Sequence, residues 1–250
     1  MSLDIIILTK NEARNITACL NSFKGFGQAI VVDDESSDET VALAEAVGAK
    51  VFSRKMDNYS AQRNFALEQS EADWVFFLDA DERFTPGLKE GIERHIAGKP
   101  AAGEVLRVNY AFGRRFRFGH LAPDRVARLF PKGHVRWEGL VHESAKTDLP
   151  TKKISGYEEH YTYGNWEHFL GKMERYSRLW AKEAAEKGRS CCAFVAVIRA
   201  FLNFFKMFVI KLGFLDGPAG WAICLVSAYY TLSKYLILSD LNCVKALKER

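Results

Sequence analysis

Short apolar runs alternate with helical segments in the first 80 residues, and this alternation limits the fold more than any other feature. The runs are rich in Ile, Val and Phe, which predicts buried strands at residues 4–8, 29–33, 50–53 and 74–78. Segments with helical spacing separate them, at residues 12–22, 38–47 and 60–69. Strands that alternate with crossover helices predict a parallel sheet, which binds ligands at the carboxyl ends of its strands.

The pattern changes after Pro86. Residues 104–112, 125–130 and 134–141 have strand character without intervening helices, which predicts an antiparallel addition to the sheet. Residues 166–187 then show apolar side chains at helical spacing, as expected of an amphipathic helix that packs on a core. We therefore expect an α/β fold with a mixed, mainly parallel central sheet flanked by helices.

Polar clusters follow the predicted parallel strands, and Asp79-Ala80-Asp81 is the sharpest of them. Residues i and i+2 of a strand share a face, so the two carboxylates are expected to converge on one hard cation. A solvated acidic loop is the common alternative for such a short pattern. Two further clusters, at residues 9–12 and 33–34, end neighbouring strands. Together the three clusters predict a metal and phosphate site.

Two other groups have chemistry suited to a nucleotide. Asp33 and Asp34 can accept hydrogen bonds from a base or ribose, although helix capping is the plainer explanation. Arg63, beside Gln62 at the start of a helix, offers a guanidinium fork that suits phosphate. An exposed helix arginine is the equally good alternative for Arg63.

A third group of candidates lies between residues 114 and 143. An adjacent imidazole and carboxylate, His142 and Glu143, can serve as a metal ligand and a general base, provided that the strand has ended there. Seven basic residues and one acidic residue occupy positions 114–136. They predict either a solvated surface or a binding site for an anionic acceptor.

The C-terminal part is apolar and basic. Residues 151–250 carry 15 basic and nine acidic side chains, which favours an anionic membrane surface as partner over nucleic acid. The longest charge-free run, residues 217–233, has 17 residues and falls short of a bilayer span. Arg199, Asn203 and Lys206 share one helical face among phenylalanines, which predicts a helix in the membrane interface. A hairpin buried against the catalytic part or in a dimer is the alternative.

Composition and the first residues bear on location. With 48% hydrophobic and 26% charged residues, the chain is able to form a core and is not expected to be disordered. Residues 1–8 lack the cationic start of a signal peptide, and the five cysteines include no CxxC pair. We therefore expect reduced thiols and a cytoplasmic protein that is peripheral on the cytosolic face of the membrane.

The ordered set of sequence patterns resembles family 2 glycosyltransferases, in particular the branch of lipopolysaccharide-core β-1,4-glucosyltransferases. The resemblance is carried by Leu8-Thr-Lys-Asn-Glu12, Val31-Val-Asp-Asp34, Gln62-Arg-Asn64, the segment 74–82 and Val141-His-Glu143. The sequence Lys211-Leu-Gly-Phe-Leu-Asp-Gly217 extends it over almost the whole chain. The second pattern departs from the family, because Glu35-Ser36 and Glu39 stand where glycines are usual.

The resemblance implies a GT-A fold, a nucleotide-sugar donor and an inverting transfer assisted by Mn²⁺ or Mg²⁺. The implied donor-site residues are Thr9, Asn11, Glu12, Asp33, Asp34, Gln62, Arg63, Asp79 and Ala80. Metal ligands would be Asp79, Asp81 and His142, and acceptor contacts would be Arg125, Arg128 and Trp137. Glu143 is the implied general base, and Glu138 is the second candidate.

These expectations combine into one hypothesis with two alternatives. The chain would move a sugar, expected to be glucose, from a UDP-sugar to a lipopolysaccharide-core or other lipid-linked acceptor. A polyprenyl-phosphate or polymer glycosyltransferase, and a catalytically silent membrane-interaction module of the same fold, are the alternatives. Residues 1–165 would form the catalytic domain, with the donor half at 1–100 and the acceptor half at 101–165. Residues 166–250 would form a helical, membrane-associating region; the oligomeric state is open.

Overall fold

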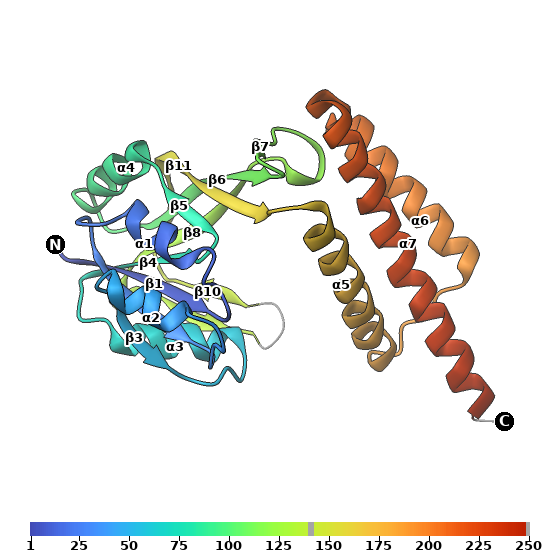
Figure 1. Cartoon of the computed structure of the whole chain (residues 1–250), viewed down its shortest axis with the longest axis horizontal. Helices are drawn as coiled ribbons and strands as arrows, with labels where there is room; N and C mark the ends of the chain where they lie inside the picture. Colours follow the sequence, from blue (N-terminus) through green and yellow to red (C-terminus); the bar gives the residue numbers. More distant parts are fainter. Residues whose placement is uncertain (140–142, 249–250) are drawn as a thin grey trace. The chain divides into compact units, whose positions relative to one another are not determined.

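The computed structural model describes residues 1–139 and 143–248 (Figure 1). Contacts between Cα atoms divide the chain into two compact units. The first unit comprises residues 1–108 and 124–161, and the second comprises residues 109–123 and 162–250. Each unit is described by itself below.

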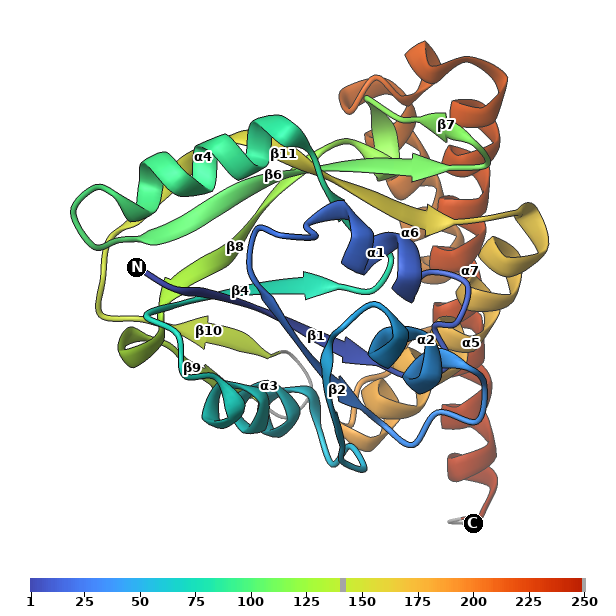
Figure 2. The same cartoon turned by 60° about the vertical axis from the view of Figure 1, so that its left-hand side comes forward.

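The first unit is built on a mixed sheet whose strand order is β3-β2-β1-β4-β8-β6-β11-β5 (Figure 2). Its parallel part consists of β1 (Leu3–Thr9), β2 (Gln28–Asp33), β3 (Lys50–Ser53) and β4 (Trp74–Asp79). All four were expected from the apolar runs, within one or two residues. The central residues of β1, β2 and β4 are almost wholly buried because helices cover both faces, as is usual for parallel sheets.

Alternate strand residues enter two separate cores. On one face, Ile5, Ile7 and Phe76 pack with α1 (Ile16–Ser22), α2 (Thr40–Ala46) and α4 (Pro86–Ile96). On the other face, Ile6 and Phe77 pack with α3 (Tyr59–Gln69) and with Trp137. The period of two along each strand thus produces a three-layer unit, in which the sheet lies between the two groups.

Side-chain hydrogen bonds cap the start of α3 and α4, the two longer helices of the first unit. The Asn58 side chain accepts a hydrogen bond from the Ala61 amide at the start of α3. The Thr85 side chain does the same for the Leu88 amide at the start of α4, where Pro86 occupies the first turn. Both satisfy amide groups that a helix start leaves without intrahelical partners.

The remaining strands of the first unit are antiparallel. They are β5 (Glu82–Phe84), β6 (Ala102–Ala111), β8 (Asp124–Pro131) and β11 (Thr151–Tyr163), and the last residues of β6 and β11 belong to the second unit. A separate antiparallel pair consists of β9 (Arg136–Glu138) and β10 (Ser144–Lys146). Strand β9 covers residues 136–138 of the strand expected at 134–141. Strands β5 and β11 were not among the elements expected from sequence.

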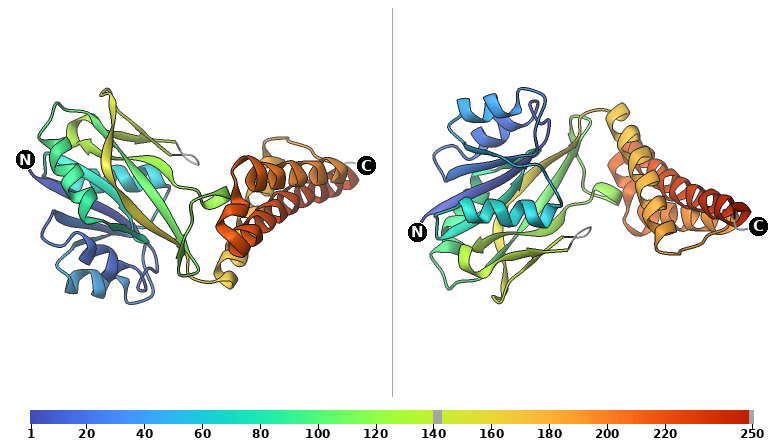
Figure 3. Two further views of the ribbon diagram at one scale, coloured as in Figure 1. Left: turned by 90° about the horizontal axis from the view of Figure 1, so that it is seen from above. Right: turned by 90° about the horizontal axis from the view of Figure 1, so that it is seen from below.

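The second unit is helical, with α5 (Trp166–Glu186), α6 (Ala193–Phe205) and α7 (Gly217–Lys248) side by side (Figure 3). The π turn η3 (Lys206–Ile210) and the 3-10 turn η4 (Gly213–Asp216) join α6 to α7. Residues 109–123, with the short strand β7 (Arg114–Arg115) and the 3-10 turn η1 (Gly119–Leu121), pack on this junction. The expected division after residue 165 stays a prediction.

Asp216 anchors that packing. Its buried carboxylate accepts hydrogen bonds from the backbone amides of Arg117 and Phe118, at 3.1 and 2.8 Å. The Arg114 guanidinium donates to the Asp216 carbonyl at 2.8 Å. The sequence Lys211–Gly217 therefore has a structural role in holding residues 112–118 against the helices.

Two helical stretches, Ala193–Ile210 and Gly213–Val244, are long and apolar enough to cross a membrane. Only 11% of the apolar window in the first and 28% in the second is buried, which distinguishes them from the core helices of a water-soluble protein. From sequence, the charges in this region predicted helices that do not cross a membrane. By length and composition, these two stretches meet the requirement.

The close packing of α4 on β11 gives a stability prediction. A Cβ atom at Gly91 would lie 2.1 Å from the Ser155 carbonyl oxygen and 2.9 Å from Ile154 Cγ2. We expect Gly91→Ala to lower the free energy of unfolding by about 1–3 kcal/mol, because the helix has to move away from the strand. Urea unfolding of the whole chain measures this change.

Gly87→Ala is the matched control in the same helix. Its Cβ atom would lie 3.9 Å from the Gly156 Cα atom, an ordinary contact. This variant should keep or slightly raise the free energy of unfolding. Equal stability of the two variants would contradict the proposed close contact at Gly91.

Candidate active site

The sheet register brings the predicted polar clusters together at one edge. Thr9 at the end of β1 is opposite Asp33 at the end of β2, and Leu8 of β1 is opposite Asp79 at the end of β4. The carboxyl ends of these parallel strands are the usual position of a ligand site in an open α/β sheet. Sequence order and sheet order together explain why residues 70 positions apart are neighbours here.

Asp33 and Asp34 have different partners. The Thr9 hydroxyl donates to Asp33 at 3.0 Å, and the Ser36 amide donates to Asp33 at 2.7 Å, so Asp33 shapes the loop. Asp34 accepts from the Lys10 ammonium at 2.7 Å and from the Met56 amide at 2.8 Å. These hydrogen bonds, that from Lys10 above all, lower the pKa of Asp34.

Two residues in the left-handed backbone region bring the first two loops together. Asn11 has φ 55° and Glu35 has φ 50°, a conformation that costs side-chain-bearing residues energy. The Asn11 amide donates to the Ser36 hydroxyl at 2.8 Å, and the Asn11 side chain accepts from the Ser37 amide at 2.8 Å. The Glu12 amide donates to the Thr40 hydroxyl at 2.8 Å. Glu35 thus adopts the conformation for which a glycine is usual.

Three successive residues of α3 have three different roles. Gln62 is buried and donates to the Arg54 carbonyl at 2.8 Å. Arg63 points toward the strand ends, with Nη2 3.5 Å from Asp79 and 4.0 Å from Glu143. Asn64 exchanges two hydrogen bonds of 2.9 Å with the backbone of Trp137, which holds β9 on α3.

Arg63 and Trp137 form a buried pair with unused hydrogen-bonding capacity. The Arg63 guanidinium lies 4.5 Å from the centre of the Trp137 ring, within range of a cation–π interaction. Within the described residues, Arg63 Nε and Trp137 Nε1 are buried without a hydrogen-bond partner. Because buried donors are usually satisfied, these two are suited to a ligand or to ordered water.

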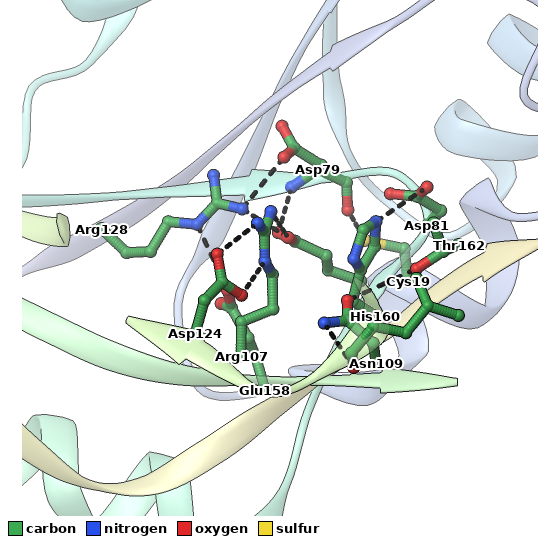
Figure 4. Close-up of polar contacts among 12 residues, drawn as sticks. Cys19, Asp79, Asp81, Arg107, Asn109, Asp124, Arg128, Glu158, His160 and Thr162 are labelled. Atoms are coloured by element: carbon green, nitrogen blue, oxygen red, sulfur yellow. Dashed lines mark hydrogen bonds and ion pairs between the residues drawn. The ribbon is translucent and has the colours of Figure 1, made fainter. Parts of the chain in front are cut away.

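Asp79 and Asp81 do not share a strand. β4 ends at Asp79, and Ala80 and Asp81 form the turn that leads to β5. Figure 4 shows the two carboxylates with separate partners: Asp79 faces Arg128, whereas Asp81 lies 3.3 Å from His160 Nε2. The strand stops before Asp81, so the two carboxylates do not share a strand face, contrary to the prediction from sequence.

A buried charge cluster supports this turn (Figure 4). The Arg128 guanidinium contacts the carboxylates of Asp79 at 2.9 Å, Glu158 at 3.3 Å and Glu82. Glu82 also accepts a hydrogen bond from the backbone amide of Asp79 at 2.9 Å. The Arg107 guanidinium lies 3.5 Å from the Glu82 carboxylate. Burial disfavours the charged form of Asp79, but Arg128 and Arg63 outweigh it and hold the pKa of Asp79 well below its usual range.

Burial shifts the pKa of the two other carboxyl groups of this cluster the opposite way, and it raises the pKa of Glu82. Burial, together with the neighbouring charge of Glu82, raises the pKa of Glu158 to about 8. One of its oxygens, Oε2, is buried without a hydrogen-bond partner among the described residues. Glu158 is therefore a neutral acid at neutral pH, which limits the negative charge that Arg128 has to balance.

The three predicted acceptor residues lie in different surroundings. Arg125 is exposed on β8, whereas Arg128 and Trp137 are buried and engaged by the contacts described above. Acceptor binding by these residues stays a prediction. Glu143 lies beside Arg63, Glu138 is exposed at the end of β9, and His142 lies outside the described residues.

Among residues 1–139 and 143–248, no group of three or more His, Cys, Asp or Glu side chains is placed to hold a metal ion. Asp81 and His160 nevertheless offer a carboxylate and an imidazole 3.3 Å apart, and each is partly exposed. Mg²⁺ and Mn²⁺ commonly take one or two protein ligands and complete their shells with phosphate and water. This donor pair fits such an ion.

The family model for glycosyl transferase family 2 matches residues 4–165, well over half of the chain. The chain belongs to this family. The match, together with the strand order described above, confirms the expected GT-A fold and the assignment as a glycosyltransferase. The match includes every residue placed at the candidate site above.

Similar proteins extend over almost the whole chain. An uncharacterized glycosyltransferase of Rickettsia prowazekii is 27% identical over 96% of this chain and 87% of its own length. The lipopolysaccharide core biosynthesis glycosyltransferase LpsC of Rhizobium meliloti is 24% identical over 100% of this chain and 95% of its own.

Two solved structures are more distant. S. aureus TarS 1-349 in complex with UDP-GlcNAc is 18% identical, with a TM-score of 0.45 over 96% of this chain and 91% of that one. Glucosyl-3-phosphoglycerate synthase from Mycobacterium tuberculosis, in complex with Mn²⁺, UDP and phosphoglyceric acid, is 20% identical. Its TM-score is 0.35 over 45% of this chain and 44% of that one.

The protonated state of Glu158 predicts a pH dependence. A carboxyl group whose pKa is raised by folding binds a proton more tightly in the folded state, so its contribution to stability falls as pH rises from its unfolded pKa, about 4.3, to about 8. We expect Glu158→Gln to remove this contribution. The stability of the variant relative to the wild type should increase over this pH range, by at most about 1.4 kcal/mol per pH unit.

Urea unfolding at a series of pH values measures the effect. Glu159→Gln is the matched control, because adjacent strand residues point to opposite faces of β11. Unfolding free energies of Glu158→Gln and wild type that stay parallel across this range would show that Glu158 is ionised in the folded protein.

Proposed function

We propose that the chain is an inverting glycosyltransferase that moves a sugar, expected to be glucose, from a UDP-sugar to a lipid-linked or lipopolysaccharide-core acceptor. One observation carries this proposal. Arg63, Asp79, Asp81 and Glu143 are brought to the carboxyl ends of the parallel strands of a family 2 glycosyltransferase domain. They supply positive charge, cation ligands and a base in one place.

The donor site uses the loops that follow β1, β2 and β4. Thr9, Asn11, Glu12, Asp33 and Asp34 form the proposed nucleotide side, and their mutual hydrogen bonds order these loops before the ligand binds. Such preorganisation lowers the entropic cost of binding. Gln62 donates a hydrogen bond to the Arg54 carbonyl at the start of α3. Asp79 and Ala80 are the proposed contacts of the ribose.

Arg63 is the proposed phosphate contact. Its guanidinium is held by Trp137, Asp79 and Glu143, and its Nε atom is buried without a partner among the described residues. A diphosphate that binds here would meet a cation of fixed orientation. That arrangement stabilises the charge that develops on the departing UDP.

Asp81 is the proposed metal ligand, with His160 as a second and His142 as the residue inferred from sequence. The bound Mn²⁺ or Mg²⁺ would neutralise the leaving diphosphate. Asp79 is the less suitable ligand, because Arg63 and Arg128 already contact its carboxylate. We assign to Asp79 the positioning of Arg63 and of the ribose.

Glu143 is the proposed general base. It takes the proton of the acceptor hydroxyl while that oxygen bonds to the anomeric carbon, and the bond from this carbon to the diphosphate oxygen breaks. The single displacement inverts the anomeric configuration. Glu143 lies 4.0 Å from Arg63, the proposed phosphate contact, which favours it over Glu138, an exposed residue at the end of β9.

The acceptor side is proposed from the exposed Arg125, whose charge suits an anionic acceptor. The apolar α6 and α7 would hold the protein at the cytosolic face of a membrane, where a lipid-linked acceptor is available. The likeness to LpsC, named for lipopolysaccharide core biosynthesis, supports this acceptor class.

Donor binding tests the proposal first. Calorimetric titration with UDP should show binding in the presence of Mn²⁺, and removal of the metal with EDTA should weaken it by about tenfold or more. Asp81→Asn should cause the same loss even with Mn²⁺ present. Asp148→Asn, at an exposed carboxylate that pairs with His134, is the control and should bind UDP as the wild type does.

The absence of UDP binding under either condition would contradict the donor assignment. It would then favour the alternative of a catalytically silent membrane module. Equal UDP affinity of Asp81→Asn and wild type would instead refute only the role of Asp81.

The base is tested by comparing two carboxylates. Glu143→Gln should lower the rate of UDP release in the presence of lipopolysaccharide-core acceptor by about 10²–10⁴-fold, because it removes proton transfer. Its UDP affinity should match that of the wild type. If Glu138→Gln loses the activity and Glu143→Gln retains it, the base is Glu138.

A further inference from the structure

The pair α6 and α7 turns large apolar side chains outward, while several of its polar groups bond between the helices, although Arg199 is itself exposed. Between the helices, the Asn203 amide donates to the Ser227 hydroxyl at 3.0 Å, and Arg199 donates to the Tyr235 hydroxyl at 3.2 Å. On the outside, Phe194 is 73% exposed and Phe201 is 66% exposed. A helix pair made for water has the opposite arrangement, so the medium that fits this surface is hydrocarbon.

A groove of about 370 Å³ runs between the two helices within this apolar surface. The small side chains of Ala200 and Ala228 make room for it, and its larger lining side chains include Phe201, Leu225 and Tyr229. The groove is shallow and open along the surface. Because the groove opens on the exposed apolar surface, the hydrocarbon that covers this surface also reaches the groove.

Charge and aromatic side chains mark one end of this region. The turn η3, which directly follows α6, begins with Lys206 and is followed by Lys211, and both are exposed. Trp221, one helical turn before Leu225, is 54% exposed. Tryptophan and lysine are typical of the boundary between hydrocarbon and headgroups. The nearby Asp216 carboxylate is buried and accepts hydrogen bonds from two backbone amides, whereas Lys206 and Lys211 present their charges at the surface.

We propose that the groove between α6 and α7 binds one acyl chain of an anionic membrane lipid, with the lipid phosphate at the end of η3. The proposal deepens the proposed function, on which it rests, because it gives the helical unit a specific contact with the membrane in which a lipid-linked acceptor would lie.

Photolabelling tests the groove directly. Vesicles of phosphatidylethanolamine and phosphatidylglycerol carry a phosphatidylglycerol with a diazirine on its acyl chain, and mass spectrometry locates the label on the full chain. The label should concentrate on Phe201, Leu225 and Tyr229 over the equally exposed Phe194 outside the groove. Ala228→Phe, which fills the groove, should reduce this labelling by about tenfold, equivalent to about 1.4 kcal/mol in binding.

Ala193→Phe is the matched control, because it adds the same side chain at an exposed position outside the groove. It should leave the labelling unchanged. Calorimetric UDP binding in the presence of Mn²⁺ verifies that each variant is folded and reports separately on the donor site.

The other outcomes separate the groove from the proposed function. Even labelling of Phe194 and Phe201 in vesicle-bound protein would overturn the acyl-chain site while leaving membrane association intact. Cross-links between two copies through the groove would assign it to a dimer. Failure to bind the vesicles would overturn both the groove and the membrane location, and UDP binding would then show whether the transferase assignment stands alone.

Discussion

The candidate site depends on one buried cation. Arg128 contacts Asp79, Glu82 and Glu158, and Glu82 in turn accepts the backbone amide of Asp79. Without the guanidinium, the buried carboxylates would lose their compensating charge, a change that typically costs about 3–5 kcal/mol when one partner of a buried pair is removed. The turn that carries Asp81 is attached to the sheet through this cluster. Arg128 therefore connects the stability of the sheet with the geometry of the proposed metal site.

A second consequence concerns charge at the site. Arg63 and Arg128 keep Asp79 ionised, while burial keeps Glu158 protonated at neutral pH. Arg63 and Arg128 thereby bring two guanidinium groups to the end of β4. A diphosphate is an anion that such a site accommodates, and a cation held by Asp81 would add to the same field. The site is suited to the leaving group more than to the sugar.

The parallel half of the fold could be predicted from sequence, because buried parallel strands have continuous apolar runs such as residues 74–78. The long strand β11 could not, since Glu158 and His160 occupy positions that face the site and hide the apolar alternation. For the same reason His160 was missed beside Asp81. The loop partners of Asn11 and Glu35 were equally inaccessible, because a positive φ at a residue other than glycine depends on contacts distant in sequence. Strand-end positions were predictable, whereas partners across the sheet required the structure.

The C-terminal helices show how the same residues support different expectations. From sequence, Arg199, Asn203 and Lys206 formed a polar face that was expected to lie toward headgroups. In the structure, Arg199 and Asn203 instead bond to α7, which turns the phenylalanines of α6 outward. Interhelical hydrogen bonds of this kind are used where the surroundings are apolar, because no water is present to satisfy the groups. A charged residue within an apolar helix is therefore compatible with deep insertion when a neighbouring helix supplies its hydrogen-bond partner. The length of the charge-free run alone underestimates how much of this helix pair can be buried in a membrane.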